Sequence, residues 1–174
     1  RTDGLATNSA FAQPSGIATD GTRLFVADSE TSCVRIVELD QANGAARIRT
    51  LAGGDLFQFG DRDGRGDLAR MQHPLGIAWV PVGAPGGGSI YVADTYNHKL
   101  RRLEPATRDL RSLTGRGTAG AEDGTATFAC FREPSGLSYA KHRLYVSDTN
   151  NGMIRVVTLP DGRVSTLRLT GLFA

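Results

Sequence analysis

The sequence predicts an all-β fold in which three four-stranded antiparallel blades form part of a β-propeller. The first observation is a repeat: Pro14, Pro74 and Pro134 stand 60 residues apart, and a glycine follows each proline two positions later. The second is that each proline opens a similar apolar segment, in a chain punctuated by 22 glycines and 7 prolines. A fixed period of this length indicates a repeat architecture, and frequent turn residues indicate many short strands.

Each copy is expected to contain four strands. The first follows the proline, and the second is the apolar run LFVAD, IYVAD or LYVSD. The third is CVRIVEL, KLRRL or MIRVVTL, and the fourth is RIRTLAG, LRSLTG or RVSTLRL. The second strand lacks the alternation of a half-exposed strand, so both of its faces should be covered. A repeated meander of four such strands is typical of a propeller blade, whereas a β-sandwich would not explain the repeat.

We therefore assign residues 1–174 to one partial propeller, with blades at about 14–53, 74–115 and 134–169. The second copy is six residues longer than the others between its proline and Asp94. The extra residues fall in the Gly- and Pro-rich stretch 80–89, which is expected to form a surface hairpin because a strand interior would not tolerate it.

Composition narrows the class of protein. The chain is 40% hydrophobic and 22% charged with a formal net charge of +2, so no strong electrostatic footprint for nucleic acid is visible. No apolar run approaches the ~18–20 residues of a membrane span. Cys33 and Cys130 form no CxxC motif and are expected to be buried, reduced thiols. We expect a soluble protein of the cytoplasm or an organelle lumen.

An aspartate precedes an arginine by seven residues in every copy, and the two flank the turn between the second and third strands. This spacing allows either a cross-strand ion pair within each blade or a ring of metal-binding carboxylates. The recurrence of the arginine in every copy favours the structural ion pair. The pairs are Asp28 with Arg35, Asp94 with Arg101, and Asp148 with Arg155.

No catalytic residues, metal ligands or cofactor site are predicted for this segment. His73, His98 and His142 form no recognisable set with a serine or cysteine, and no third metal ligand accompanies His73 and His98. The Asp-Gly motifs lack the bidentate glutamate and the spacing of an EF-hand. The glycines of 80–89 lack the Lys-Ser/Thr of a phosphate-binding loop.

The repeated strings resemble the NHL repeat. IYVADTYNHKLRRL and LYVSDTNNGMIRVV resemble its second and third strands, and the similarity covers nearly the whole chain. The linkers GDRDGRGDLARMQHP and GAEDGTATFACFREP are most similar to those of proteins that join a thioredoxin-like domain to NHL repeats. The copies differ at Asn97-His98, which corresponds to Thr31-Ser32 and Asn151-Gly152, so no ring of equivalent histidines is expected.

The resemblance implies a full ring of about six blades, which three blades cannot close. We therefore expect the remaining blades to come from the same protein or from another chain. A homodimer of two half-rings is the less favoured arrangement. Isolated half-rings would expose the apolar faces of their terminal blades.

Long linkers and the turns between second and third strands are expected on one face, where we predict a protein partner to bind. Phe57 and Phe59 either join this surface or pack a linker against its blade. The predicted partner-binding residues are Tyr96, Asn97, His98, Asn150, Asn151, Arg62 and Arg116.

These observations favour a non-catalytic scaffold that mediates protein–protein interaction as part of a larger protein or assembly. Two alternatives remain open: an RNA-binding propeller, and an accessory domain of a thioredoxin-like redox protein. Arginines and exposed aromatic side chains gathered on one face would favour RNA, whereas their dispersal among carboxylates would not.

Overall fold

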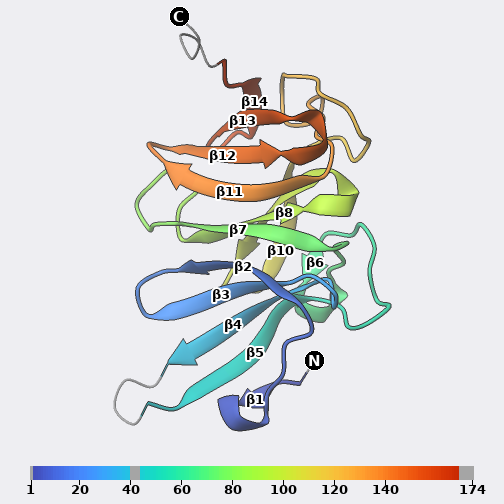
Figure 1. The fold of residues 1–174 in the computed structure, drawn as a ribbon. Coiled ribbons are helices and arrows are strands. Elements are labelled where there is room, and N and C mark those ends of the chain that lie inside the picture. Colours follow the sequence, from blue (N-terminus) through green and yellow to red (C-terminus); the bar gives the residue numbers. More distant parts are fainter. Residues whose placement is uncertain (1, 40–43, 169–174) are drawn as a thin grey trace, which may run out of the picture.

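The computed structural model describes residues 2–39 and 44–168, and within them the chain forms three antiparallel sheets stacked side by side (Figure 1). Each sheet is one blade. The first contains β1 (Gly4–Leu5), β2 (Pro14–Thr19), β3 (Arg23–Asp28), β4 (Cys33–Leu39) and β5 (Ala46–Gly53). The second contains β6 (Gly64–Arg65), β7 (Pro74–Val80), β8 (Ser89–Asp94), β9 (Lys99–Glu104) and β10 (Asp109–Thr114). The third contains β11 (Pro134–Ala140), β12 (Arg143–Asp148), β13 (Met153–Thr158) and β14 (Arg163–Thr166).

Single 3-10 turns mark the linkers and the turns between second and third strands. They are η1 (Ala6–Asn8), η2 (Gly66–Leu68), η3 (Thr95–Asn97) and η4 (Thr149–Asn151). Residue 169, the predicted end of the third blade, lies outside the described residues.

The four strands predicted for each blade are present, and the first two blades carry a short fifth strand in addition. The extra strand comes from the linker before the blade and pairs with the fourth strand, Gly4 opposite Ile48 and Gly64 opposite Leu110. In the third blade the same contact is a single bridge between Gly124 and Val164. A two-residue strand contains no alternation of apolar and polar residues, so the sequence carried no sign of it.

The core consists of the interfaces between neighbouring blades. The strands equivalent to LFVAD are central, and all six residues of β8 are buried because a blade covers each of its faces. Between the first two blades lie Phe25, Ala27, Val34, Ile36, Leu51, Ala52, Ala69, Met71, Ile77, Ile90, Val92, Leu103 and Leu110. Between the second and third lie Ala78, Val80, Tyr91, Ala93, Leu100, Ala129, Phe131, Leu144, Val146, Val157, Leu159 and Val164.

The first strands of neighbouring blades approach so closely that a glycine is required two positions after Pro14 and after Pro74. A Cβ atom on Gly16 would lie 2.3 Å from the Leu75 carbonyl oxygen, and one on Gly76 would lie 2.1 Å from that of Ser135. Backbone atoms cannot move aside as a side chain can. The repeated Pro-x-Gly motif therefore sets the spacing between blades.

Substituting Gly76 with Ala should separate the second and third blades and lower the free energy of unfolding by about 1–3 kcal/mol, the usual cost of overpacking. Urea denaturation followed by circular dichroism measures this loss. Gly136→Ala is the control, because its backbone, like that of Gly76, has no positive φ and the new Cβ would meet only the Ser147 side chain. A loss for Gly76→Ala no greater than for Gly136→Ala would contradict the close approach.

Candidate partner-binding face

The linkers and the turns between second and third strands lie on one side of the stacked blades, on the right in Figure 1. We call this surface the turn face. It comprises the turns 29–32, 95–98 and 149–152 and the linkers 54–73 and 115–133. The hairpins between first and second strands, including residues 80–89, lie on the opposite side.

A buried arginine beneath the turn face ties each linker to its blade. In the first blade Arg35 Nη1 lies 3.2 Å from Asp28, and both side chains are fully buried. Arg35 Nη2 lies 2.8 Å from Asp3 in the linker. The same guanidinium donates to the carbonyl oxygens of Ala10 and Thr2, at 3.1 and 3.0 Å. Asp3 in turn accepts hydrogen bonds from the backbone and hydroxyl of Thr50 on β5. We call this arrangement the arginine clip.

The arginine clip recurs in the third blade with nearly the same partners. Arg155 contacts Asp148 at 2.7 Å and Asp123 at 2.8 Å, and it donates to the carbonyl oxygens of Cys130 and Glu122. Asp123 accepts from Thr166 on the fourth strand. The buried aspartate also accepts from a linker N–H, that of Gln13, Gln72 or Arg132. A planar guanidinium with several donors suits such a site better than a lysine does.

The second blade has one more carboxylate at its clip. Arg101 lies 3.3 Å from Asp94, 2.7 Å from Asp61 and 3.0 Å from Asp63, and Lys99 is also paired with Asp61. Burial raises the pKa of Asp94 to about 6, although Arg101 and hydrogen bonds from Asn97 and Gln72 oppose the shift. Asp61 has a lowered pKa, because its bonds to Lys99 and Arg101 outweigh partial burial.

Three of the predicted partner-binding residues use their side chains inside the molecule. The Asn97 amide donates to Gly60 O at 2.7 Å and to Asp94 at 2.9 Å. Asn151 makes the equivalent bonds to Gly120 O and Asp148. His98 adopts a left-handed conformation, and its Nδ1 accepts the Glu133 N–H at 3.1 Å, which links the second blade to the third.

The other predicted residues reach the surface. Tyr96 is 49% exposed and stacks on His73, with ring centroids 4.7 Å apart and planes 10° apart. Asn150 is exposed. Arg62 donates to the Leu68 carbonyl, and Arg116 donates to the Thr118 hydroxyl.

Sequence reasoning left the position of Phe57 and Phe59 open, and the structure exposes 85% and 56% of these side chains. The linker before the second blade advances 11 residues from Gly53 to Gly64, whereas the linker before the third advances nine from Gly115 to Gly124. The longer linker, before the second blade, forms a turn in which Phe57 has a φ of +67°. Phe59 precedes Gly60, whose carbonyl binds the residue after Tyr96. Phe59 and Tyr96 therefore each precede one of the two residues that this hydrogen bond joins.

Aromatic residues distinguish the turn face of the second blade from that of its neighbours. The place of Tyr96 is held by Glu30 and Asn150 in the other blades, and that of His73 by Gln13 and Glu133. Ala119 stands where Phe59 does. Since the fold accepts polar or small residues at these positions, packing within the blade does not require the aromatic ones. A comparison of the residues that the three repeats have in common could not reveal this difference in exposure.

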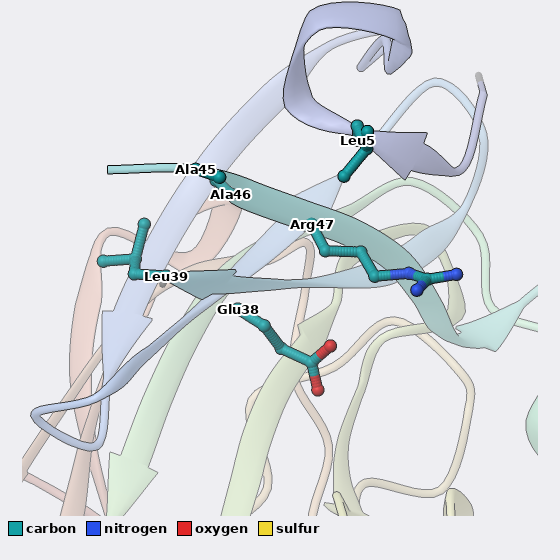
Figure 2. Close-up of a pocket in the computed structure, with 6 residues that line it drawn as sticks. All are labelled: Leu5, Glu38, Leu39, Ala45, Ala46 and Arg47. Carbon is teal, nitrogen blue, oxygen red and sulfur yellow. The ribbon is translucent and has the colours of Figure 1, made fainter. Parts of the chain in front are cut away.

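A pocket of about 250 Å³ lies away from the turn face, at the outer edge of the first blade (Figure 2). Leu5, Leu39 and the first residues of β5 line it, and its Glu38 carboxylate is bound by Arg49 at 2.6 Å. Among residues 2–39 and 44–168 no group of three His, Cys, Asp or Glu side chains is placed to hold a metal ion. Within the same described part, no helix has the length and apolar character to cross a membrane.

Curated relatives share the sequence over most of this chain. Protein SUPPRESSOR OF QUENCHING 1, chloroplastic, from Arabidopsis thaliana is 42% identical over 94% of the chain and 16% of its own length. NHL repeat-containing protein 2 is 44% identical in Bos taurus and 42% identical in Homo sapiens, over about 90% of the chain and 22% of each relative. The chain thus spans about a fifth of the length of these relatives. Comparison with models of known families gives no match.

Solved structures share the fold. An auxiliary nutrient binding protein from Bacteroides thetaiotaomicron superposes with a TM-score of 0.70 at 21% identity, over 86% of this chain and 36% of that one. A putative phosphatase from the same organism gives a TM-score of 0.71 at 24% identity, over 88% of this chain and 34% of its own. At this level of identity the likeness concerns the fold alone.

Removing the guanidinium of the third blade should strongly destabilise the protein. Arg155→Met leaves the Asp148 carboxylate buried without its cation, which should lower the free energy of unfolding by about 3–5 kcal/mol. Arg111→Met, which breaks an exposed pair with Asp109, is the control and should have little effect. Equal losses in the two variants, measured by urea denaturation, would show that the clip does not carry this stability.

The raised pKa of Asp94 predicts a loss of stability as pH rises from about 4 to about 6. Folded Asp94 holds its proton at a pH where the unfolded chain has released it, so rising pH favours the unfolded state. A two-unit shift corresponds to roughly 3 kcal/mol across this window. Unfolding free energies at pH 4, 5, 6 and 7 should show this fall in the wild type and a flatter profile in Asp94→Asn. Parallel profiles would refute the shift.

Proposed function

The chain belongs to the NHL-repeat β-propellers, and on that premise we propose that this segment is a non-catalytic scaffold that binds a protein partner through the turn face. The observation that carries the proposal is the exposed aromatic group of the second blade. Phe57, Phe59 and Tyr96 project from linkers and turns held rigidly by the arginine clips. Aromatic side chains on a rigid support are enriched among the residues that dominate binding energy at protein interfaces.

The distribution of charge favours a protein partner over RNA. Arginines of the turn face alternate with carboxylates, as in Asp61-Arg62-Asp63 and Arg65-Gly66-Asp67. Such alternation gives no continuous positive surface to follow a phosphate backbone. An aromatic patch set among charges of both signs suits a protein surface of mixed character instead.

A role beside a redox domain is supported only by the resemblance of the linkers. Both cysteines are fully buried, and burial raises the pKa of the Cys130 thiol. Thiolates are the reactive form of cysteine, so any thiol chemistry in such a protein would have to come from another domain.

Substitution of the aromatic group should abolish capture of a partner while leaving the fold intact. We expect affinity purification from native extract, with quantitative mass spectrometry, to recover a defined protein with the wild type. Phe57→Ser combined with Tyr96→Ala should reduce its recovery by about tenfold or more, because losing interfacial aromatic anchors typically costs 2 kcal/mol or more. Recovery equal to wild type would refute the turn face as the binding surface.

The matched control is Val82→Ser, since Val82 is 83% exposed on the opposite side of the blades. It removes a similarly exposed apolar side chain and should leave recovery unchanged. Circular dichroism should show the same strand content in all variants. An equal loss of the partner from the Val82→Ser variant would indicate nonspecific binding to exposed apolar side chains.

A further inference from the structure

A hydrogen bond at the turn face joins the first blade to the second, and its equivalent joins the second blade to the third. At the first junction the His73 N–H donates to Ser32 Oγ at 3.2 Å. At the second junction the Glu133 N–H donates to His98 Nδ1 at 3.1 Å. Each donor directly precedes the repeated proline, and each acceptor lies in the turn that follows the buried aspartate. We call these two bonds the first and second turn links.

The backbone has the same conformation at both turn links. The acceptor residues Ser32 and His98 have φ angles of +49° and +55°, and the donor residues His73 and Glu133 have φ angles of +52° and +53°. Such left-handed conformations are uncommon for residues other than glycine. Their recurrence at equivalent positions means that the two links share one local geometry and differ only in the acceptor atom.

The two acceptor atoms respond differently to acid. The hydroxyl oxygen of Ser32 keeps its lone pairs at neutral and mildly acidic pH, whereas an imidazole nitrogen accepts a hydrogen bond only while it carries no proton. Because His98 Nδ1 accepts from Glu133, the neutral ring holds its single proton on Nε2. A histidine in water has a pKa of about 6.5, so acidification from pH 7 to pH 5 turns its acceptor nitrogen into a donor.

The backbone around His98 is held on both sides, so the ring cannot follow a movement of its own turn. The His98 N–H donates to the Thr95 carbonyl oxygen at 3.1 Å. On the other side, a Cβ atom on Gly115 would lie 2.7 Å from the His98 carbonyl oxygen. Once protonated, the half-buried ring either turns away from the Glu133 N–H or faces that donor with a second donor. Either arrangement breaks the second turn link, and a hydrogen-bonding group left without its partner costs stability.

The charged residues nearest the second turn link along the chain are mostly cations. Lys99 follows His98 on β9 and is paired with Asp61. The linker 115–133 brings Arg116 and Arg132, together with Glu133 itself. The cations oppose protonation of the ring, and the Glu133 carboxylate favours it. Since the link uses the backbone N–H of Glu133, Glu133→Gln removes the carboxylate and keeps the donor.

We propose that the second turn link is an acid-sensitive switch, in which protonation of His98 releases the Glu133 N–H and loosens the linker 115–133 from the second blade. The first turn link stays closed because Ser32 does not titrate. The Arg132 carbonyl oxygen accepts the Asn150 N–H at 3.1 Å, so the released segment adjoins the turn of the third blade. The turn face therefore changes between its second and third blades. The proposal does not depend on what the turn face binds.

Amide hydrogen exchange followed by NMR tests the proposal on the folded chain. We expect the protection factor of the Glu133 N–H, corrected for the intrinsic exchange rate, to fall about tenfold from pH 7 to pH 5, since one hydrogen bond is lost. The protection factor of the His73 N–H should stay the same. The ¹⁵N shifts of the His98 ring at pH 7 should show the proton on Nε2.

The first turn link supplies the matched control variant. His98→Ser copies its hydroxyl acceptor and should make the protection of Glu133 the same at both pH values. His73→Gln removes the other histidine of these links but keeps its backbone N–H, so the fall at Glu133 should persist. Glu133→Gln should also retain the fall. The Asp94 effect predicted above stabilises the fold in acid, so it cannot produce a loss of protection there.

Three results would overturn the proposal. The first is equal protection of Glu133 at pH 5 and pH 7 in the folded wild type. The second is an equal fall in His98→Ser, and the third is a His98 proton on Nδ1 at pH 7. Circular dichroism at both pH values shows whether the chain remains folded. Unfolding of the whole chain at pH 5 would reduce protection at His73 and Glu133 alike, which would also exclude a local switch.

Discussion

The buried arginine of each blade is the interaction on which the rest of this structure depends. Its guanidinium joins a fully buried aspartate on the second strand, an aspartate in the linker and linker carbonyl oxygens. Removing such a charge from water is unfavourable unless opposite charges and hydrogen bonds surround it, and here they do. All but two of the 20 basic residues are arginines, and the three buried at the clips use the planar, many-donor geometry that lysine lacks.

Because the clip fastens each linker to its own blade, the turn face is a rigid support for the residues that project from it. The linker aspartate holds the fourth strand as well, through Thr50, Ser112 or Thr166. A short linker strand is added to the same edge. The linker is therefore part of the blade, and its exposed side chains project from a backbone that is tied to that blade.

The scaffold and the candidate site draw on different residues of the same turns. Asn97 and Asn151 recur in the second and third blades, where they anchor the linkers at Gly60 and Gly120, and Thr31 takes their place in the first. Tyr96, which directly precedes Asn97, has no aromatic counterpart in the neighbouring blades, where Glu30 and Asn150 stand. At such positions a departure from the repeat points to binding, and agreement with it points to the fold.

The sequence by itself determined the repeated blades, their strands and the pairing of Asp28 with Arg35, because these depend on local periodicity and on a spacing that recurs three times. It did not reveal the linker strand at Gly64, which is too short for a pattern. Nor did it show that the Phe57 side chain is exposed whereas the Asn97 side chain is hydrogen-bonded within the molecule. Exposure depends on which neighbouring blade or linker covers a side chain, and the same residue type is buried at Ile77 and open at Ile17. Only the stacking of the blades decided that.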